Sequence, residues 1–547
     1  MKKMKKMNKV FSIMVAGLLA TGGLAGCSEQ GGVLSAFKNR PKEVVVYYAA
    51  NGYGTQWITK IAEKYMTDHN EDTYINLKKT VTQSEDIAKV EAGVDVGDLY
   101  LMDFHMEDKT YAFENISDVY DSYPIGETEK KIGDKLDPAY KNYITQIGAQ
   151  DYIMPYLGIS GGYNFAYNKT LLDGLLPNGY TLPRTTQEFT ELGDIIKDDA
   201  YLLNASFKDS SDWVLYMNST WFAQLLGAEG YRQYMSGRYY DATQEKWVFD
   251  EAKPTVYEKN ATAAEDYFNI MESIYNINNG YVHEDWVAMD AMDVEAAFAG
   301  FGFGQNSKLG AFLIHGVFLE QEMGWMLAEQ EAMGNKQEIR MMRMPMASGI
   351  IKRTPSIESE NELRTVIDYV DKVLDGETAT KPEGVTDEDI AIIQEARGMC
   401  GMFMAGGMIV PKEAKNKAGA KDFMRYLASD EAAIIAAQNV NGINMLPFGK
   451  QVTDEELGFA RSEFMKDCMK ISNSTSMVVS SDSQEHKFAY IAKFGAGTSM
   501  RTHLLTFLNG TNTLNGRTYY QQSYTAYESR WEMGVTAYKG QGGNTAN

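Results

Sequence analysis

Strands alternate with helices along the first part of this chain, and that order limits the folds available to it. The run 43–48 (Glu-Val-Val-Val-Tyr-Tyr) is rich in β-formers and is followed by the glycine loop 51–54. Apolar residues recur at helical spacing over 57–65, a second helix is expected around 84–92, and a second apolar strand follows at 98–102. Strands that alternate with helices predict an α/β fold with a parallel sheet.

Two loops follow the carboxyl ends of these strands and are the first candidates for ligand binding. The loop 51–54 has the sequence Asn-Gly-Tyr-Gly, and the segment 103–105 has the sequence Asp-Phe-His. Ligands of open α/β sheets bind outside the carboxyl ends of the strands. A third strand-containing unit is expected at 152–167, and 171–293 is expected to be mostly helical apart from a hairpin at 238–249.

Length and charge narrow the class of protein. The chain has 547 residues, which is more than one compact core usually holds, so two or more lobes are expected. The formal net charge of -22 argues against nucleic-acid binding, because phosphates require a basic surface. It argues equally against electrostatic docking on anionic lipid. The 34 tyrosines suit a surface that stacks on a hydrated, hydroxylated ligand, although a compositional bias explains them equally well.

The N-terminus carries the marks of a secretory signal. Five lysines within the first nine residues precede an apolar run at 10–20, which is shorter than the roughly 20 residues a membrane span needs. The segment Leu24-Ala25-Gly26-Cys27 follows and resembles the bacterial lipobox, whose cysteine is acylated and becomes the first mature residue. The alternative is an ordinary signal peptide in which Cys27 is incidental. Lipidation of Cys27 predicts a protein at the extracellular face of the cell membrane, held there by lipid alone.

Cysteine and histidine are scarce, and their spacing predicts neither a metal site nor a cofactor. Apart from Cys27 the chain has Cys400 and Cys468, which could pair in an oxidising compartment. Cys400 lies in the apolar run 399–404, which favours a buried free thiol. The 6 histidines are scattered without zinc-site spacing, so no metal and no cofactor are expected.

Five stretches in a fixed order resemble one known family. They are the early strand with Asn51-Gly52, the strand 97–101, the segment 155–169 with its Tyr167-Asn168-Lys169 triplet, the run 314–318, and 407–412 followed by 418–431. Together with the lipobox they resemble the extracellular solute-binding lipoproteins of bacterial ABC importers, in the carbohydrate group that includes maltose-binding protein. The resemblance implies two α/β lobes of the periplasmic-binding-protein type, joined by crossing strands and closing over the ligand about a hinge.

The same resemblance implies how the chain divides between the lobes. The chain is expected to cross near 158–162, where Gly161-Gly162 is consistent with a strand bend or a bulge, to return after about 350, and to cross again near 450. The resulting parts are a signal peptide 1–26, a lipid-anchored flexible linker 27–41, lobe 1 at 42–158, lobe 2 at 159–350, an acidic helical insertion 351–398, lobe 1 at 399–450, lobe 2 at 451–540 and a disordered tail 541–547.

The first lobe offers five candidate ligand-binding residues. Sugar recognition needs aromatic faces for the ring and planar polar groups for the hydroxyls. Asn51 and Tyr53 supply an amide and a phenol, although a strand-to-helix turn explains the same loop. The resemblance places Asp103, Phe104 and His105 where the family's second strand delivers ligand contacts. Asp103 is able to accept hydroxyl hydrogen bonds and Phe104 to stack, and the alternative is a helix cap by Asp103.

The second lobe offers five more candidates: Tyr163, Asn164, Trp221, Trp286 and Phe318. The resemblance places Trp221 in a helix that faces the ligand, and a buried core tryptophan is the alternative. Phe318 stands where relatives commonly carry an aromatic that stacks on sugar, here as phenylalanine rather than tryptophan. Some relatives have a charged residue at the crossing where this chain has Gly161, which puts specificity for maltodextrins in doubt.

These features predict a monomeric receptor that captures an extracellular carbohydrate, an oligosaccharide, and delivers it to ABC permease subunits, with no catalytic residues. Two alternatives stay open. A secreted glycoside hydrolase would need two carboxylates about 5 to 10 Å apart, and with 74 acidic residues chance pairs abound. The cluster His283-Glu284-Asp285-Trp286 sets titratable groups beside an aromatic ring. The other alternative is a surface lipoprotein that binds peptides.

Overall fold

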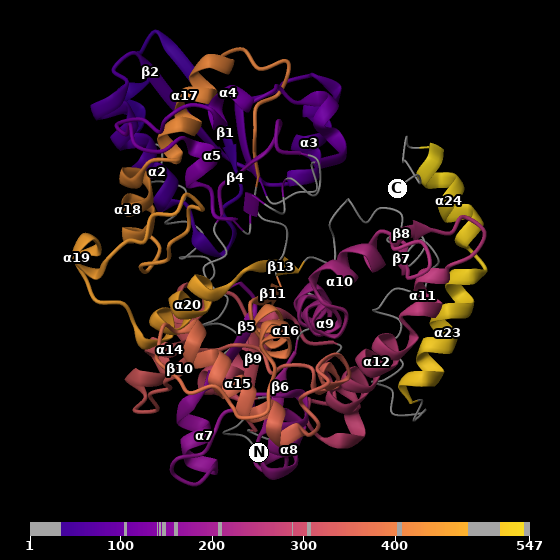
Figure 1. Ribbon diagram of the computed structural model, residues 1–547. Helices are drawn as coiled ribbons and strands as arrows, with labels where there is room; N and C mark the ends of the chain where they lie inside the picture. The colour runs from indigo at the N-terminus through magenta and orange to yellow at the C-terminus, as the bar shows by residue number, and fades with distance from the viewer. Residues whose placement is uncertain are drawn as a thin grey trace, which may run out of the picture.

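The computed structural model has two α/β lobes, one above the other in Figure 1. It describes residues 34–102, 107–138, 140–141, 144, 149–157, 162–205, 211–286, 288–302, 308–401, 407–479 and 515–540, and the statements below concern these. The lipobox, the candidate segment 103–105 and the tail 541–547 lie outside the described residues.

The sheet of the upper lobe combines N-terminal strands with one strand from much later in the chain. Its order is β2-β1-β3-β12-β4. The strands are β1 (Lys42–Tyr48), β2 (Thr73–Lys79), β3 (Leu99–Met102), β4 (Met154–Pro155) and β12 (Gly407–Ile409). β1 is parallel to β2 and β3, as predicted, but β12 is antiparallel to both β3 and β4. The sheet is therefore mixed, because the strand that returns late in the chain enters in the opposite direction.

From Val44 onward every second residue of β1 is buried, so one face of this sheet packs against the hydrophobic core. Val44, Val46 and Tyr48 are buried, whereas the residues between them are half-buried. Helix α2 presents Trp57 and Ile61 to the same core. The upper-lobe helices are α2 (Gln56–Lys64), α3 (Gln83–Ala92), α4 (Ser117–Tyr120), α5 (Ile132–Lys135), α17 (Lys417–Leu427), α18 (Asp430–Gln438) and α19 (Asp454–Leu457), with short turns η1 (Leu34–Phe37), η2 (Asn51–Tyr53), η3 (Tyr65–His69) and η4 (Glu107–Ala112).

The sheet of the lower lobe is mainly antiparallel. Its order is β10-β5-β9-β6, with strands β5 (Asn164–Asn168), β6 (Tyr201–Asn204), β9 (Gly310–His315) and β10 (Ile339–Met342). β5 is antiparallel to β9 and β10, and β6 is parallel to β9. β6 lies inside the segment expected to be helical. Its four residues are too few for the alternation of apolar and polar residues that marks a strand to be recognised within a helical segment.

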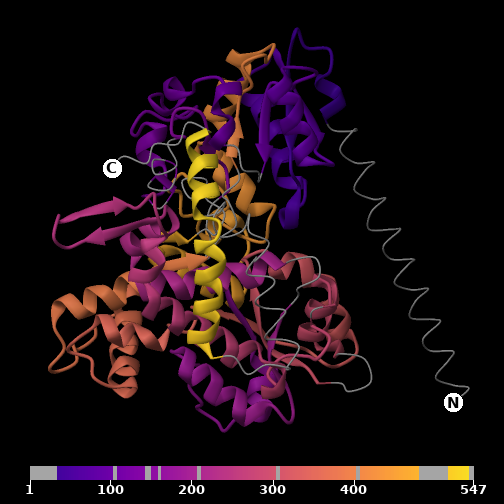
Figure 2. The ribbon, with the colours of Figure 1, turned by 90° about the vertical axis from the view of Figure 1, so that its right-hand side faces the viewer.

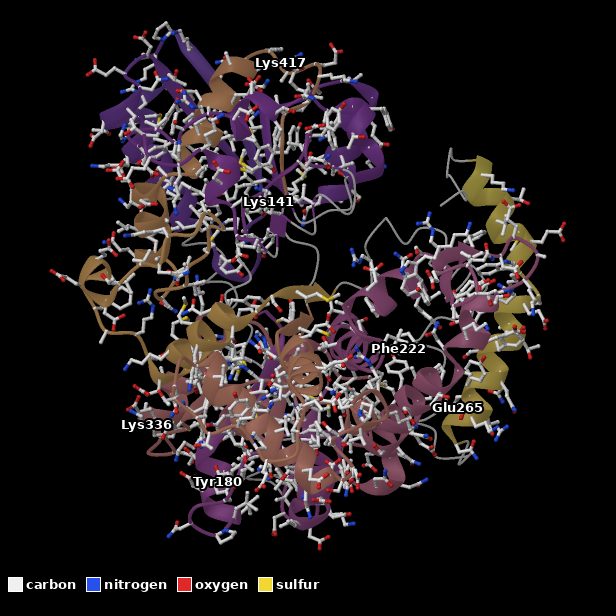
Figure 3. The ribbon with its side chains drawn as sticks, viewed as in Figure 1. Lys141, Tyr180, Phe222, Glu265, Lys336 and Lys417 are labelled. Carbon is white, nitrogen blue, oxygen red and sulfur yellow. The ribbon has the colours of Figure 1, made fainter. Side chains whose placement is uncertain are left out.

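The lower-lobe helices surround an aromatic core. They are α7 (Lys169–Leu175), α8 (Thr186–Ile196), α9 (Ser211–Leu226), α10 (Ala228–Met235), α11 (Thr255–Lys259), α12 (Ala261–Tyr275), α13 (Ala291–Ala296), α14 (Leu319–Ala332) and α20 (Glu463–Ser474), with turns η5 (Ile277–Asn279) and η6 (Ala297–Phe301). Phe222 on α9, labelled in Figure 3, meets Tyr234 and Tyr267 with ring centroids 4.7 and 5.1 Å apart. Part of the tyrosine enrichment thus fills a core.

The C-terminal helices α23 (Gly516–Glu528) and α24 (Trp531–Gly540) run along the flank of the lower lobe beside the predicted hairpin, β7 (Arg238–Asp241) and β8 (Lys246–Phe249) (Figure 2). The Gly516 backbone N–H donates to Asn269 Oδ1 at 2.8 Å, and Trp531 Nε1 donates to the Asp250 carbonyl at 2.8 Å. These contacts fix the end of the described chain to the second lobe.

A two-stranded sheet, β11 (Met399–Gly401) with β13 (Met477–Val479), lies near the junction of the two lobes in Figure 1. It contains Cys400, which is buried and forms no disulfide; the same holds for Cys468 on α20. The expected burial of an unoxidised Cys400 thiol is confirmed. No helix among the residues described combines the length and the apolar content needed to cross a membrane.

The segment 351–398 is helical, as its sequence predicts, and has its own apolar cluster. It contains α15 (Glu360–Leu374) and α16 (Asp387–Arg397), preceded by the turn η8 (Ser348–Arg353). Leu363 and Ile393 lie in that cluster. Arg397 donates to both oxygens of Asp371 within the segment, at 2.8 and 2.6 Å. Its guanidinium also donates to the Met344 carbonyl at 2.6 Å, which ties the segment to the lower lobe.

Candidate functional site

The two lobes touch where the turn η2 meets the start of helix α14. Gln321 Nε2 donates to the Tyr53 carbonyl oxygen at 2.9 Å. Gly52 faces the second lobe so closely that a Cβ atom there would lie 2.4 Å from Glu322 Oε1 and 2.8 Å from the Phe318 ring. We call this contact the interlobe seam: Gly52 and Tyr53 from the upper lobe, and Phe318, Gln321 and Glu322 from the lower lobe.

The strands explain why these residues meet. η2 follows the carboxyl end of β1, and Phe318 follows the carboxyl end of β9. The seam therefore forms where ligands of open α/β sheets bind. Gly316 permits the local chain path, because a Cβ atom at this position would lie 2.5 Å from the Phe318 ring.

Three aromatic side chains converge at the seam. The Phe318 ring meets Tyr53 edge-on at a centroid distance of 5.5 Å and Tyr163 at 6.1 Å. It also meets the imidazole of His315 at 5.1 Å. Tyr53, Tyr163 and Phe318 are each half-buried, so all three keep some exposed surface. The structure thus brings together three of the predicted ligand-binding residues, from separate segments and from both lobes.

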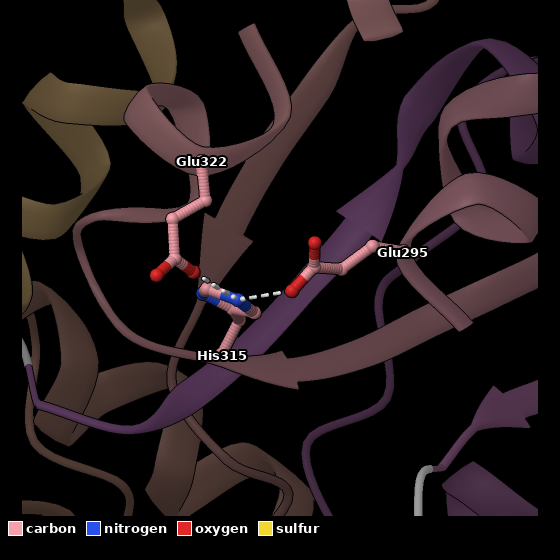
Figure 4. A group of neighbouring side chains, drawn as sticks. All are labelled: Glu295, His315 and Glu322. Atoms are coloured by element: carbon pink, nitrogen blue, oxygen red, sulfur yellow. Dashed lines mark hydrogen bonds and ion pairs between the residues drawn. The ribbon is translucent and has the colours of Figure 1, made fainter. Parts of the chain in front are cut away.

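His315 forms the polar part of this region and lies between two carboxylates (Figure 4). Its Nε2 is 3.4 Å from Glu295 Oε1 and 3.3 Å from Glu322 Oε2. Burial by itself lowers the pKa of His315, but hydrogen bonding to Glu295 and Glu322 and their negative charges outweigh that effect and raise the pKa to about 9. The imidazole is therefore protonated on both nitrogens, and positively charged, at neutral pH when no metal ion is bound.

Sequence reasoning did not find this polar cluster, nor Gln321. Glu295 belongs to α13, His315 to the end of β9 and Glu322 to the first turns of α14. Their carboxylate and imidazole ligand atoms all lie within 4.8 Å of one another, which makes them candidate metal ligands. No short sequence motif connects them, because the fold alone brings the three elements together.

Asn164 follows Tyr163 in the chain and is buried. Its Oδ1 accepts from the Met344 backbone N–H at 3.3 Å, and its Nδ2 donates to Cys400 Sγ at 3.4 Å. The Tyr163 N–H donates to the Gly401 carbonyl at 2.9 Å. In this conformation the Asn164 amide connects β5 to neighbouring segments of the chain.

Trp221 and Trp286 lie in the core of the lower lobe, with exposed fractions of 0% and 1%. Trp221 Nε1 donates to the Pro345 carbonyl at 2.8 Å, and Trp286 stacks on Tyr275 with centroids 5.2 Å apart. Neither ring presents a face to solvent in this structure. The position of Trp221 corresponds to the alternative of a core tryptophan.

The structure does not describe the side chains of the remaining predicted ligand-binding residues. Asp103, Phe104 and His105 lie outside the described residues, and the side chain of Asn51 at the start of η2 is likewise not described. A stacked pair close to η2 was not predicted: Trp57 lies parallel to Tyr156 at 6.3 Å, and both rings are buried. Because both rings are buried, this pair belongs to the core against which the seam residues pack.

The architecture is a two-lobed α/β fold shared with solved solute-binding proteins. Comparison with protein-family models finds no match, and comparison with curated proteins finds none either. Solved structures do match. The bacterial solute receptor AcbH, described as having an exclusive preference for β-D-galactopyranose, matches with a TM-score of 0.55 at 14% identity, over 90% of this chain and 99% of that one.

Two further solved structures match over similar lengths. Maltose-bound MalE3 from T. maritima has a TM-score of 0.52 at 12% identity, covering 90% of this chain and 99% of its own. Ligand-free RafE from Streptococcus pneumoniae has a TM-score of 0.51 at 15% identity, covering 90% and 98%. The predicted fold class, a two-lobed α/β fold of the periplasmic-binding-protein type, is confirmed.

Proposed function

We propose that this protein is an extracellular receptor that captures a carbohydrate between its lobes and delivers it to an ABC permease. The observation that carries the proposal is the convergence of Tyr53, Tyr163 and Phe318 at the interlobe seam. Half-buried aromatic rings suit the C–H faces of sugars, and Gln321 and Glu322 offer hydrogen-bonding groups beside them. The shared fold with AcbH and MalE3, whose names describe sugar ligands, supports the same conclusion.

Binding would work as a hinge equilibrium. A ligand that contacts residues of both lobes stabilises the closed state by the difference between its affinities for the closed and open states. The permease then recognises the closed receptor. This function breaks no bond and requires no cofactor.

One sequence pattern favours a test for hydrolysis as well. Residues 158–162 match Gly-x-Ser-x-Gly, the pattern of the nucleophile elbow in serine hydrolases. That elbow requires a strand, a sharp turn and a helix, whereas here the described chain continues from Gly162 into strand β5. The pattern thus lacks its structural context, and binding remains the better-supported function.

A thermal-shift screen against oligosaccharides tests the proposal. Ligand at 100 times its Kd stabilises the native state by about 2.7 kcal/mol, which gives a measurable rise in the unfolding temperature. We expect a rise with one class of glycan and unchanged glycans by chromatography. Cleaved products would identify a hydrolase, and a response to peptides alone would identify a peptide-binding lipoprotein.

Replacing Phe318 with alanine should weaken sugar binding by roughly tenfold to a hundredfold, because aromatic anchors carry much of the binding energy at such contacts. The ring is half-buried, so the fold should persist. Titration calorimetry with the sugar from the screen measures the effect. Tyr240→Ala, at a 50% exposed residue of the β7–β8 hairpin, is the control. Unchanged affinity in Phe318→Ala would remove Phe318 from the site.

The proposed receptor function includes a lipid anchor on Cys27. In a lipobox the cysteine sulfur accepts the acyl chain, so Cys27→Ala should abolish incorporation of labelled fatty acid and release the protein into the medium. Cys468→Ala, at a buried free thiol, is the matched control and should leave labelling intact. Labelling that persists in Cys27→Ala would show that the cysteine is incidental.

A further inference from the structure

We propose that Glu295, His315 and Glu322 bind a single divalent transition-metal cation of the Zn²⁺ type. This would be a second function of the lower lobe, not expected from the sequence, at a site that shares Glu322 with the interlobe seam. Each side chain comes from a different element, and the two carboxylates face His315 Nε2 from either side (Figure 4).

The two distances from His315 to the carboxylates are long for charge-assisted hydrogen bonds and are also compatible with ligands of one metal ion. Charge-assisted N–H···O bonds between a histidine and a carboxylate measure about 2.7 to 2.9 Å. Here His315 Nε2 lies 3.4 and 3.3 Å from the oxygens of Glu295 and Glu322. Four ligands placed tetrahedrally at the Zn–N and Zn–O distances of about 2.0 to 2.2 Å are separated from one another by about 3.3 to 3.6 Å. The two observed separations have the length of an edge of that tetrahedron.

The second ring nitrogen fixes the imidazole in the orientation that a metal requires. His315 Nδ1 lies 3.1 Å from the Gly316 carbonyl oxygen, and because a carbonyl only accepts, Nδ1 must donate. Metal-binding histidines commonly hold their other N–H in this way, which leaves the Nε2 lone pair for the cation. In the metal-free protein a proton on Nε2 lies between the two carboxylates, and a bound cation would take its place.

The supporting structure is rigid on one side and accessible on the other. His315 is fully buried and Glu295 is 8% exposed, on a helix whose start is fixed by a reciprocal cap between Asp290 and Asp293. The side chain of Glu322 is 31% exposed and provides the entry path. Three protein ligands leave a fourth position for water, as in open zinc sites.

The ligand set also selects among cations. Ca²⁺ and Mg²⁺ prefer oxygen ligands throughout, whereas one imidazole with two carboxylates suits Zn²⁺ and its neighbours in the first transition row. Zn²⁺ and Co²⁺ should therefore bind at one equivalent, and Ca²⁺ and Mg²⁺ should not compete at similar concentrations.

The test uses the full chain, purified in detergent without a histidine tag and freed of metal with a chelator. Zn²⁺ is titrated by calorimetry, and Co²⁺ is added to observe the visible absorption of a tetrahedral complex. Glu322→Gln should lower the affinity for Zn²⁺ at least tenfold, since it removes one anionic ligand at a partly exposed position. Glu329→Gln makes the same charge change further along α14, at an exposed residue, and should have no effect.

His315→Gln provides an independent arm, because it removes the nitrogen ligand and should abolish the tetrahedral Co²⁺ absorption. Should His315→Gln fail to fold, Glu322→Gln alone decides. The proposal is overturned if the chelated full chain binds neither cation at one equivalent. It is equally overturned if Glu322→Gln binds Zn²⁺ as tightly as Glu329→Gln, which would leave the cluster as an ion triad bridged by a proton. Sugar binding is measured separately, so failure of the metal site leaves the receptor function untouched.

Discussion

Replacing Gly52 with valine is expected to weaken sugar binding by roughly 5- to 150-fold, the effect of 1–3 kcal/mol on a conformational equilibrium. In this structure a Cβ at Gly52 would lie 2.4 Å from Glu322 Oε1 and 2.8 Å from the Phe318 ring. The carboxylate could move aside, but the two γ-methyl groups of valine would also meet the ring. Overpacking of this kind costs about 1–3 kcal/mol, and here it acts only when the lobes touch.

The free protein should retain its unfolding temperature, because φ at Gly52 is not positive and an open state relieves the clash. Calorimetry with the sugar and a thermal melt without it separate the two effects. Gly174→Val is the control, since open space surrounds that glycine in α7. Gly52→Val with unchanged affinity would mean that the interlobe seam is not part of the bound state.

Replacing Trp221 with alanine should destabilise the lower lobe by about 3–5 kcal/mol, the usual cost of removing a buried large aromatic side chain. The ring is 0% exposed, and its loss would also leave the Pro345 carbonyl without its 2.8 Å hydrogen bond. Urea denaturation followed by circular dichroism measures the change. Trp221→Phe keeps most of the packing and should cost distinctly less.

This substitution separates the two interpretations of Trp221. A core residue loses stability first and affects binding only through the fold. If Trp221→Ala leaves the unfolding midpoint unchanged but abolishes sugar binding, the ring must reach the ligand in another conformation, and the core assignment would be wrong.

The sequence predicts most of the elements near the site. Strong β-formers at 43–48 and helical spacing over 57–65 correspond to β1 and α2, and the hairpin at 238–249 is found as predicted. β12 shows the limit of such reasoning: its apolar run predicts a strand, but its antiparallel pairing with β3 depends on the path of the chain through the other lobe. The residues of β12 and its neighbours in sequence do not determine that path.

The residues of the candidate site were likewise only partly predictable from the sequence. Tyr53, Tyr163 and Phe318 were found because aromatic residues follow expected strands or stand where relatives carry them, and the structure brings the three together. Glu295 and Glu322 could not be found in this way, since glutamates at helical positions are common and only the fold sets these two on either side of His315. Trp221 shows the opposite case, in which an aromatic candidate packs in the core.

The most direct test of the central claim measures the distance between the lobes. Spin labels attached at Val81→Cys in the upper lobe and Met333→Cys in the lower lobe would sit at positions that are 97% and 58% exposed. A Cys27→Ala background removes the proposed lipidation site, and Cys400 and Cys468 are buried. Pulsed electron spin resonance with the sugar found in the screen should show a distance distribution that narrows and shifts on binding. A distribution that stays the same at saturating ligand would contradict a receptor that closes over its sugar.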